Sequence, residues 1–266
     1  MKIKAVTYNV LATAYIEPAR YPFTPPELLD AKTRLPALTK HLIKLDADLL
    51  CLQEVEEEMF AVINRSLSPL GYEGVLTKKG GGKPDGCAIF VRSKALEWVR
   101  LVRLEYDDAI GKTPRSGHVA QILVLKWEGR FLGVANTHLK WDPPSTPRDH
   151  KYGHRQLTQL LRVRQELAPE CDGWIICGDF NVTSENEIIQ TLQRSGLQFS
   201  HANAHSVATC NSNRRAKMID YVFHTDTIEL TALELPQIQN DTPLPGPDQP
   251  SDHIAVMTNL KWKDER

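Results

Sequence analysis

The sequence has no excess of charge of either sign. Its 32 lysine and arginine residues are balanced by 33 aspartate and glutamate residues, which gives a formal net charge of -1 with histidine neutral. Proteins that bind extended duplexes through many phosphate contacts usually carry a strong positive charge. The composition therefore disfavours a polycationic nucleic-acid binder and favours a short or small substrate.

Long hydrophobic runs are also missing. The longest apolar stretches, residues 47–52 and 174–177, fall far short of the ~20 residues that a membrane-spanning helix needs. Residues 1–6 alternate like the start of a strand and lack the apolar core of a signal peptide. We therefore expect a cytoplasmic protein that does not act at a membrane.

Paired cysteines are the third absence. The chain has five cysteines, an odd number, and none of them form a CxxC pair: Cys51, Cys87, Cys171, Cys177 and Cys210. This pattern argues against a disulfide framework and against a structural zinc site. We expect free thiols that are mostly buried.

Strand-like and helix-like segments alternate along the chain. Apolar and polar residues alternate over residues 2–9, which predicts a strand, and apolar residues recur at helical spacing over 35–45. Residues 119–127 and 130–136 flank Glu128-Gly129, which predicts a hairpin with a tight turn. Further strands are predicted at 47–52, 87–91, 174–177, 218–224 and 254–261, and further helices at 59–67, 155–167 and 185–194.

This mixture predicts an α/β fold. Strands, hairpins and helices in this order suit a four-layer α/β sandwich, in which two packed mixed sheets are flanked by helices. The length of 266 residues fits a single domain that spans residues 1–266.

Acids, amides and histidines cluster at the ends of the predicted strands. A buried carboxylate is costly unless it is paired or bound to a metal, so a repeated arrangement of this kind indicates a site. Hard oxygen ligands suit Mg²⁺ or Mn²⁺, an Asp–His pair can transfer a proton, and an amide or imidazole can stabilise charge on phosphate oxygens. The pattern therefore predicts phosphate ester hydrolysis by this set: Asn9, Glu54, Asp85, Asn136, His138, Asp179, Asn181, Asp220, Asp252 and His253.

Six short motifs carry a resemblance to a known family. They are Tyr8-Asn9-Val10-Leu11, Leu52-Gln53-Glu54-Val55, Asn136-Thr137-His138-Leu139, Gly178-Asp179-Phe180-Asn181, Ile219-Asp220-Tyr221-Val222 and Ser251-Asp252-His253. In their order, and over residues 8–253, these motifs resemble the endonuclease/exonuclease/phosphatase superfamily, whose fold is that of deoxyribonuclease I. A further segment, Asp85-Gly86-Cys87-Ala88-Ile89-Phe90, resembles the deadenylase and nocturnin-like branch, whose members attack RNA 3′ ends or nucleotide phosphates.

The resemblance implies a metal site and a proton-transfer pair. Glu54 would be the main carboxylate ligand of a Mg²⁺ ion, or of Mn²⁺, helped by Asn9 and Asp252. Asp220 would hold His253 in a fixed tautomer, as an Asp orients a catalytic imidazole in other enzymes.

The resemblance also implies groups that hold the phosphate and the water. Asp179 and Asn181 would orient the attacking water and a phosphate oxygen, and either Asp179 or the Asp220–His253 pair would take the proton. His138 would donate to a non-bridging phosphate oxygen.

Three residues are expected to contact the substrate or to steady the site. Asn136 lies at the same strand end as His138, and His118 stands where the branch tends to carry an Asn. Asp85 would lie near the nucleotide, although Lys83-Pro84-Asp85-Gly86 is also an ordinary turn sequence. For His118 a surface or core position is an equal alternative.

The sequence therefore predicts a metal-dependent phosphohydrolase that acts on a nucleic-acid 3′ end or on a nucleotide, with no obligate protein partner. The alternatives are a phosphatase that removes a 2′-phosphate from a dinucleotide cofactor, an endonuclease, a phospholipid-directed phosphodiesterase and a non-catalytic scaffold. The basic run Arg214-Arg215-Ala216-Lys217 either meets a phosphate backbone or is a solvated charge cluster. Loop aromatics such as Trp141 and Phe23 either stack on bases or cover the edge of the core.

Overall fold

The computed structural model describes residues 1–199 and 207–264 of the chain. Two six-stranded sheets dominate it, and a separate two-stranded hairpin lies beside them. The first sheet has the strand order β13-β14-β1-β2-β4-β3, in which only β1 and β2 are parallel. Its strands are β13 (Ile228–Ala232), β14 (Val256–Trp262), β1 (Ile3–Asn9), β2 (Leu49–Glu56), β4 (Asp85–Arg92) and β3 (Tyr72–Lys78).

The second sheet repeats this plan. Its order is β5-β6-β7-β8-β12-β9, and only β7 and β8 are parallel. Its strands are β5 (Glu97–Glu105), β6 (Val119–Trp127), β7 (Arg130–His138), β8 (Gly173–Asp179), β12 (Asp220–His224) and β9 (Gln198–Phe199). The separate hairpin consists of β10 (Cys210–Ser212) and β11 (Arg215–Lys217).

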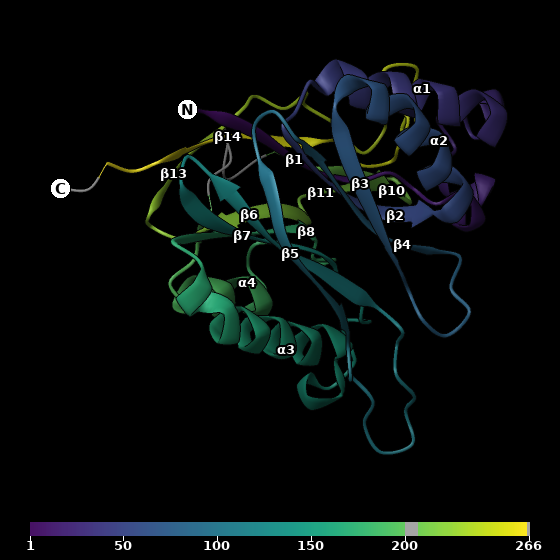
Figure 1. Ribbon diagram of the computed structural model, residues 1–266. Coiled ribbons are helices and arrows are strands. Elements are labelled where there is room, and N and C mark those ends of the chain that lie inside the picture. The colour runs from purple at the N-terminus through teal and green to yellow at the C-terminus, as the bar shows by residue number, and fades with distance from the viewer. Residues whose placement is uncertain (200–206, 265–266) are drawn as a thin grey trace.

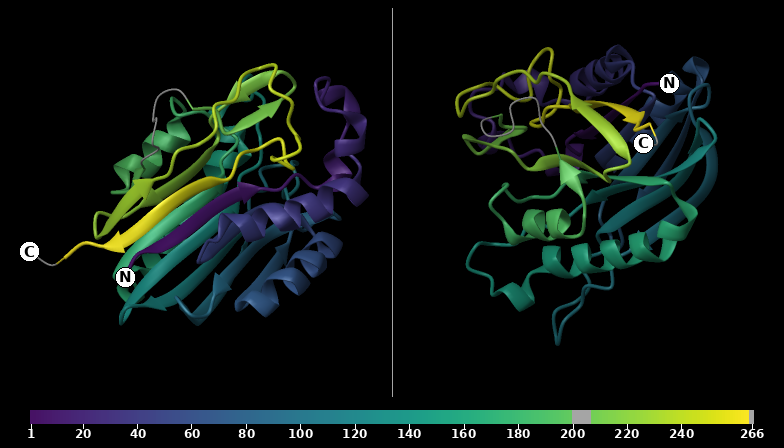
Figure 2. Two further views of the ribbon diagram at one scale, coloured as in Figure 1. Left: turned by 90° about the horizontal axis from the view of Figure 1, so that it is seen from above. Right: turned by 90° about the vertical axis from the view of Figure 1, so that its left-hand side faces the viewer.

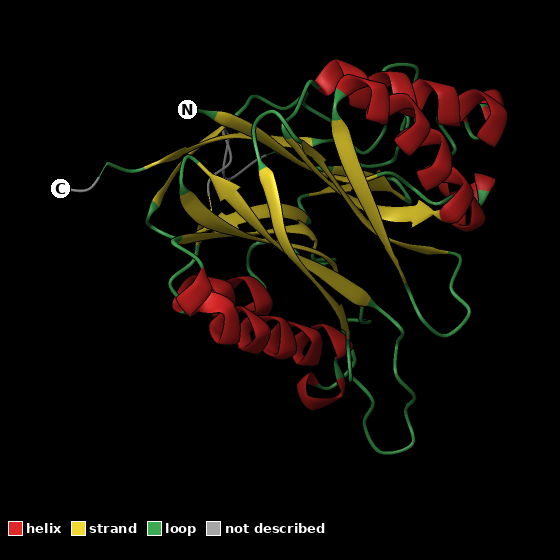
Figure 3. Cartoon of the chain, in the orientation of Figure 1, coloured by secondary structure: helices red, strands yellow, loops and turns green. Residues whose placement is uncertain are grey.

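The two sheets pack face to face, and helices cover their outer faces (Figures 1 and 3). A central apolar cluster joins side chains from both sheets, such as Leu49 and Leu123. Helices α1 (Ala31–Leu45) and α2 (Glu57–Leu67) pack on the first sheet, and α3 (Tyr152–Leu167) and α4 (Glu187–Arg194) pack on the second. The predicted four-layer α/β sandwich is therefore confirmed.

Local signals explain where several elements begin and turn. Helix α1 begins at Ala31 rather than at the predicted residue 35, because the Asp30 carboxylate accepts a hydrogen bond from the Lys32 backbone N–H and caps the helix. The predicted hairpin turn is confirmed: Glu128 and Gly129 both have positive φ angles, as a two-residue turn of the type I′ class requires. All five cysteines are free, and four of them are buried.

Some strands were not predicted. Strand β5 lies at a sheet edge, and an irregularity between Trp98 and Arg100 interrupts its alternation of apolar and polar residues. Strand β3 is also an edge strand, and its Gly74 faces the ring of Phe90, where a Cβ atom would lie only 2.3 Å from the ring. Among the described residues, no helix has the length and apolar character needed to cross a membrane.

The strand registers bring the predicted motifs to one end of the molecule. Asn9 pairs with Gln53 across the parallel β1–β2 pair, and His138 pairs with Asp179 across the parallel β7–β8 pair. Asp220, at the start of antiparallel β12, also pairs with Asp179. In the left view of Figure 2 the two termini lie at the opposite end of the sheets from the β10–β11 hairpin.

Candidate active site

A cavity of about 930 Å³ opens at this end of the two sheets. Six of the residues that the sequence singled out line it: Glu54, His138, Asp179, Asn181, Asp252 and His253. Asn9 and Asp220 lie behind the cavity wall and are joined to it by hydrogen bonds. The structure places the other three predicted residues, Asp85, His118 and Asn136, outside the lining.

Asp220 and His253 form a buried pair. The His253 Nδ1 atom lies 2.9 Å from Asp220 Oδ2 and 3.1 Å from Oδ1, and the Thr209 hydroxyl donates to the same carboxylate at 2.6 Å. Burial alone would lower the pKa of His253, but the Asp220 charge and the Cys210 thiol raise it well above its usual value. His253 is therefore a cation at neutral pH, with Nδ1–H held by Asp220.

Asp179 stands between the two predicted histidines. Its Oδ2 atom lies 3.7 Å from the Nε2 atoms of both His253 and His138, and it accepts a hydrogen bond from Asn9 Nδ2 at 3.0 Å. Burial and the Asp220 charge raise the pKa of Asp179 to about 7, although His253 and Asn9 act in the opposite direction. Asp179 is therefore a carboxylate that can accept a proton near neutral pH.

The backbone around Asp179 needs its motif residues. A Cβ atom at Gly178 would lie only 1.8 Å from the Thr137 carbonyl oxygen, so no other residue fits beside β7. Asn181 has a φ of 55°, in the left-handed region that asparagine tolerates better than most residues. From there its amide reaches the Leu139 carbonyl oxygen at 2.9 Å and the His138 Nε2 atom at 3.0 Å.

Glu54 lies at a bulge in the first sheet. The β2–β4 register shifts between Gln53 and Val55, and Glu54 has a φ of 58°. Bulges of this kind turn a side chain away from the regular alternation of the strand. The Glu54 carboxylate is thereby aimed at the cavity, where it accepts from Asn9 Nδ2 and from the Ala12 backbone N–H, both at 3.0 Å.

The carboxylates on the cavity floor repel one another. Burial raises the pKa of Glu54, the Lys79 charge opposes that rise, and the Asp252 charge adds to it. Asp252 in turn accepts a hydrogen bond from the Tyr21 hydroxyl at 3.2 Å. Two anionic side chains held together in this way match the oxygen-rich donor set of a hard divalent cation.

Two further groups of side chains could offer ligand atoms to a metal. Within the described part of the chain, Asp179, Asp220 and His253 each place one ligand atom within 4.8 Å of the others, and so do Cys210, Asp252 and His253. In the first group, however, the His253 Nδ1 atom is already hydrogen-bonded to Asp220. That group is consequently better suited to proton transfer than to metal binding.

Lys79 is a site residue that the sequence analysis missed. Its Nζ atom lies 2.6 Å from Asp85 Oδ2 and 3.3 Å from His138 Nδ1, and only 5% of the residue is exposed. An ammonium group can only donate, so the Lys79 contact favours an acceptor at His138 Nδ1, whereas the Asn181 Nδ2 group, also a donor, lies 3.0 Å from His138 Nε2. Burial and the Lys79 charge lower the pKa of His138 well below its usual value. His138 is therefore neutral, with a donor group close to each of its ring nitrogens.

Asp85 lies behind His138 rather than on the cavity wall. Its two oxygens are engaged by Lys79 and by the Tyr15 hydroxyl, at 2.6 and 2.7 Å, and the residue is fully buried. This position allows Asp85 to act on the site through Lys79. Lysine is common and Lys79 belongs to no motif, so only the folded structure reveals its role.

His118 and Asn136 also lie behind the cavity wall. The His118 Nδ1 atom lies 2.9 Å from the His138 carbonyl oxygen, and burial together with the Lys79 charge lowers the pKa of His118 to about 3. Asn136 has no exposed surface; it accepts from Gln53 Nε2 at 2.7 Å and donates to the carbonyl oxygens of Leu52 and Ala88, both at 3.0 Å. Asn136 thus fastens the second sheet to the first directly beneath the site.

Comparison with known proteins agrees with this geometry. A profile of the Endonuclease/Exonuclease/phosphatase family matches residues 6–253. Carbon catabolite repressor protein 4 homolog 4 of Arabidopsis thaliana is 26% identical, over 100% of this chain and 79% of that protein. The 2′,5′-phosphodiesterase 12 of Homo sapiens is also 26% identical over 98% of this chain, which spans only 52% of that longer protein.

Solved structures share the fold. The structure of ANGEL2, described as a 2′,3′-cyclic phosphatase, superposes with a TM-score of 0.85 at 21% identity and covers 98% of this chain and 95% of its own. The human Nocturnin catalytic domain gives a TM-score of 0.76 at 23% identity and covers 98% of this chain and 94% of its own. The deadenylase and nocturnin-like resemblance stated from the sequence is therefore confirmed.

Proposed function

Because the chain belongs to the endonuclease/exonuclease/phosphatase family, we propose that it is a metal-dependent hydrolase that cleaves a phosphate ester bond at a nucleic-acid 3′ end or in a nucleotide. One observation carries the proposal: the buried Asp220 is hydrogen-bonded to His253, whose Nε2 atom lies 3.7 Å from Asp179 Oδ2, in a cavity that Glu54 and Asp252 also line. The relatives named as a 2′,5′-phosphodiesterase and as a 2′,3′-cyclic phosphatase support the same class of reaction.

A divalent cation fits the floor of the cavity. Glu54 and Asp252 would hold it, with Asn9 beside them, because a half-buried and a buried carboxylate here repel each other. When bound, Mg²⁺ or Mn²⁺ supplies a Lewis acid that polarises a phosphate oxygen.

The protein groups divide the remaining work. Asp179 takes the proton of the attacking water, because its raised pKa makes it a base near neutral pH. His253 is already protonated and held by Asp220, so it donates from Nε2 to the phosphate. His138 donates to a second phosphate oxygen in its Nε2–H tautomer, which the Lys79 contact favours and in which the Asn181 amide turns from Nε2 towards the phosphate. In this proposal Asp179 is the general base, a role that the sequence analysis left open between Asp179 and the Asp220–His253 pair.

The experiment is a set of incubations with Mg²⁺ or Mn²⁺ on three substrates: a 5′-labelled oligoadenylate with a free 3′-hydroxyl, NADP⁺, and a 3′-phosphorylated oligonucleotide. A ladder of shortened oligoadenylate identifies a 3′ exonuclease, whereas phosphate release without a ladder identifies an end-processing or nucleotide phosphatase. Chelation by EDTA should abolish either activity.

Two variants test the assigned residues. Glu54→Gln and His253→Ala should each reduce the rate at least about 10²-fold, the scale of losing one catalytic group, with an unchanged circular dichroism spectrum. Glu58→Gln, an exposed acid on α2, is the matched control and should keep full activity. Full activity in both site variants, or no hydrolysis of any substrate by the unmodified protein, would refute the proposal.

A further inference from the structure

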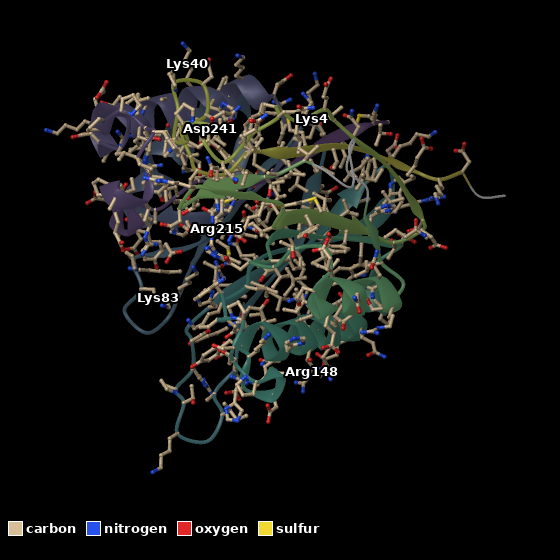
Figure 4. All side chains as sticks on the ribbon, turned by 180° about the vertical axis from the view of Figure 1, so that it is seen from behind. Lys4, Lys40, Lys83, Arg148, Arg215 and Asp241 are labelled. Atoms are coloured by element: carbon tan, nitrogen blue, oxygen red, sulfur yellow. The ribbon has the colours of Figure 1, made fainter. Side chains whose placement is uncertain are left out.

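One wall of the cavity is basic although its floor is acidic. Arg215 and Lys217 both line the cavity, and both lie on strand β11. Residues two apart on a strand point to the same face, so the two side chains form one cationic surface above the site. Figure 4 views the molecule from behind relative to Figure 1 and labels Arg215 near the centre of the view.

The hairpin that carries these cations is fastened to the segment that contains Asp252 and His253. Lys217 pairs with Cys210 on β10, and Cys210 forms a β-bridge with His253. The Asn211 backbone N–H also donates to the Asp252 carbonyl oxygen at 2.8 Å. Lys217 thus lies two strand spacings from His253, about 10 Å. The cations are held at a fixed distance from the residues that hold the reacting phosphate.

These two cations differ from Arg20, the other arginine that lines the cavity. Within residues 1–199 and 207–264, the Arg215 and Lys217 side chains form no ion pair and no side-chain hydrogen bond. By contrast, Arg20, on the same cavity, is held by two hydrogen bonds to Glu17, and Arg100 pairs with Glu170. A pair of cations without acidic partners at the mouth of a phosphate site is suited to an anion from the ligand.

An aromatic side chain completes the cavity mouth. Trp141 lines the same cavity and is 51% exposed, so its ring is open to a ligand. Exposed aromatic rings beside a basic groove are the elements with which proteins bind single-stranded nucleic acid. The basic wall and the indole together indicate a ligand that extends beyond one phosphate.

We propose that Arg215 and Lys217 form a subsite for a second phosphate, one nucleotide away from the ester that is hydrolysed. The inference rests on the proposed function, because the scissile phosphate is placed at His253 and Asp179. Two sources share this chemistry: an oligonucleotide strand and a dinucleotide with more than one phosphate. A substrate with a single phosphate does not reach the subsite.

The test compares the double variant Arg215→Gln/Lys217→Gln with the matched control Arg103→Gln/Lys126→Gln, whose exposed residues lie on β5 and β6 away from the cavity. Each protein is assayed on oligoadenylate, on NADP⁺ and on bis(p-nitrophenyl) phosphate, which has one phosphate only. We expect the double variant to raise KM for the substrate with the second phosphate about tenfold, with little change in kcat. Hydrolysis of bis(p-nitrophenyl) phosphate should be unchanged, and the control should match the unmodified protein throughout.

Whether oligoadenylate or NADP⁺ shows the larger rise in KM identifies the source of the second phosphate. If the double variant has the same KM as the unmodified protein for every substrate, and hydrolyses bis(p-nitrophenyl) phosphate normally, the subsite is overturned and the proposed function stands.

A binding measurement decides the inference independently of turnover. Fluorescence anisotropy of labelled oligoadenylate over 0.05 to 0.2 M salt should give a slope of log affinity against log salt that is shallower by about 0.7 to 1.4 in the double variant, which corresponds to one or two lost phosphate contacts. Identical slopes and affinities overturn the subsite. Absence of hydrolysis of all three substrates by the unmodified protein overturns the proposed function instead.

Discussion

Two histidines face the same carboxylate in this cavity, yet they have opposite protonation states. His253 and His138 each place Nε2 at 3.7 Å from Asp179 Oδ2. Behind His253 lies the Asp220 carboxylate, and behind His138 lies the Lys79 ammonium. Both rings are buried, so the sign of the charge behind each ring decides its state: the first is a cation and the second is neutral. The comparison shows that the protonation state of a histidine in this cavity depends on a charged residue that does not itself line the cavity.

Removing the anion behind His253 should have the largest effect. Asp220→Asn leaves the shape of the pair intact but removes the charge that keeps His253 protonated and orients its ring. We expect kcat to fall about 10³-fold, within the range known for general acid–base groups. The measurement is steady-state kinetics on whichever of the three candidate substrates the unmodified protein hydrolyses.

The control for this variant is Asp226→Asn, which changes an exposed acid in the turn after β12. It should keep the full rate. A loss below tenfold in Asp220→Asn would show that the charge behind His253 does not matter, and the comparison would fail.

Removing the cation behind His138 should have the next largest effect, and on two separate quantities. Lys79→Met leaves the buried Asp85 carboxylate without its ion-pair partner, which should lower the free energy of unfolding by about 3–5 kcal/mol. It also removes the donor at His138 Nδ1, so the Nε2–H tautomer is no longer favoured, and kcat should fall about 10²-fold. Urea denaturation and kinetics measure the two effects.

The double variant Lys79→Met/Asp85→Asn separates them. It removes both buried charges, so most of the stability should return while the rate stays low. A double variant with the rate of the unmodified protein would mean that Lys79 serves only to pair with Asp85.

The smallest expected effect concerns His118, which lies next to His138. Its pKa is about 3 in the folded protein because of burial and Lys79, against an ordinary value of 6.5. The unfolded chain therefore binds the extra proton first as the pH falls, so this contribution to stability is complete above pH 6.5 and is lost progressively towards pH 3. His118→Asn should make the unfolding free energy less dependent on pH between 6.5 and 4. An unchanged slope would show that His118 is charged in the folded state.

The sequence predicted the motif residues that line the cavity but missed Lys79, which lies behind them. Glu54 and Asp179 could be predicted because each lies near the end of a strand within a recognisable motif, and His253 because it belongs to the motif Ser251-Asp252-His253. Lys79 could not, because it meets His138 across 59 positions of the chain and has no motif of its own. The left-handed backbone of Glu54 was equally hidden, because the bulge arises from the pairing of β2 with β4 rather than from local preference.

The same reasoning applies to the fold. The interior strands β6 and β8 were predicted because they are almost entirely buried and therefore apolar. The edge strand β5 is mostly exposed, so its composition carries little trace of the sheet. Strand recognition from composition is therefore best at the centre of a sheet and weakest at its edge.

The amides of Asn136 and Gln53 join the two sheets at a point where the surrounding contacts are apolar. A slide of one sheet over the other would break the 2.7 Å bond between them and strand the Asn136 amide away from its carbonyl partners. Apolar contacts tolerate small sliding motions, whereas these directional bonds do not. These hydrogen bonds therefore fix the spacing between the Glu54 side of the cavity and the Asp179 side. The two halves of the site are preorganised relative to each other before a substrate binds.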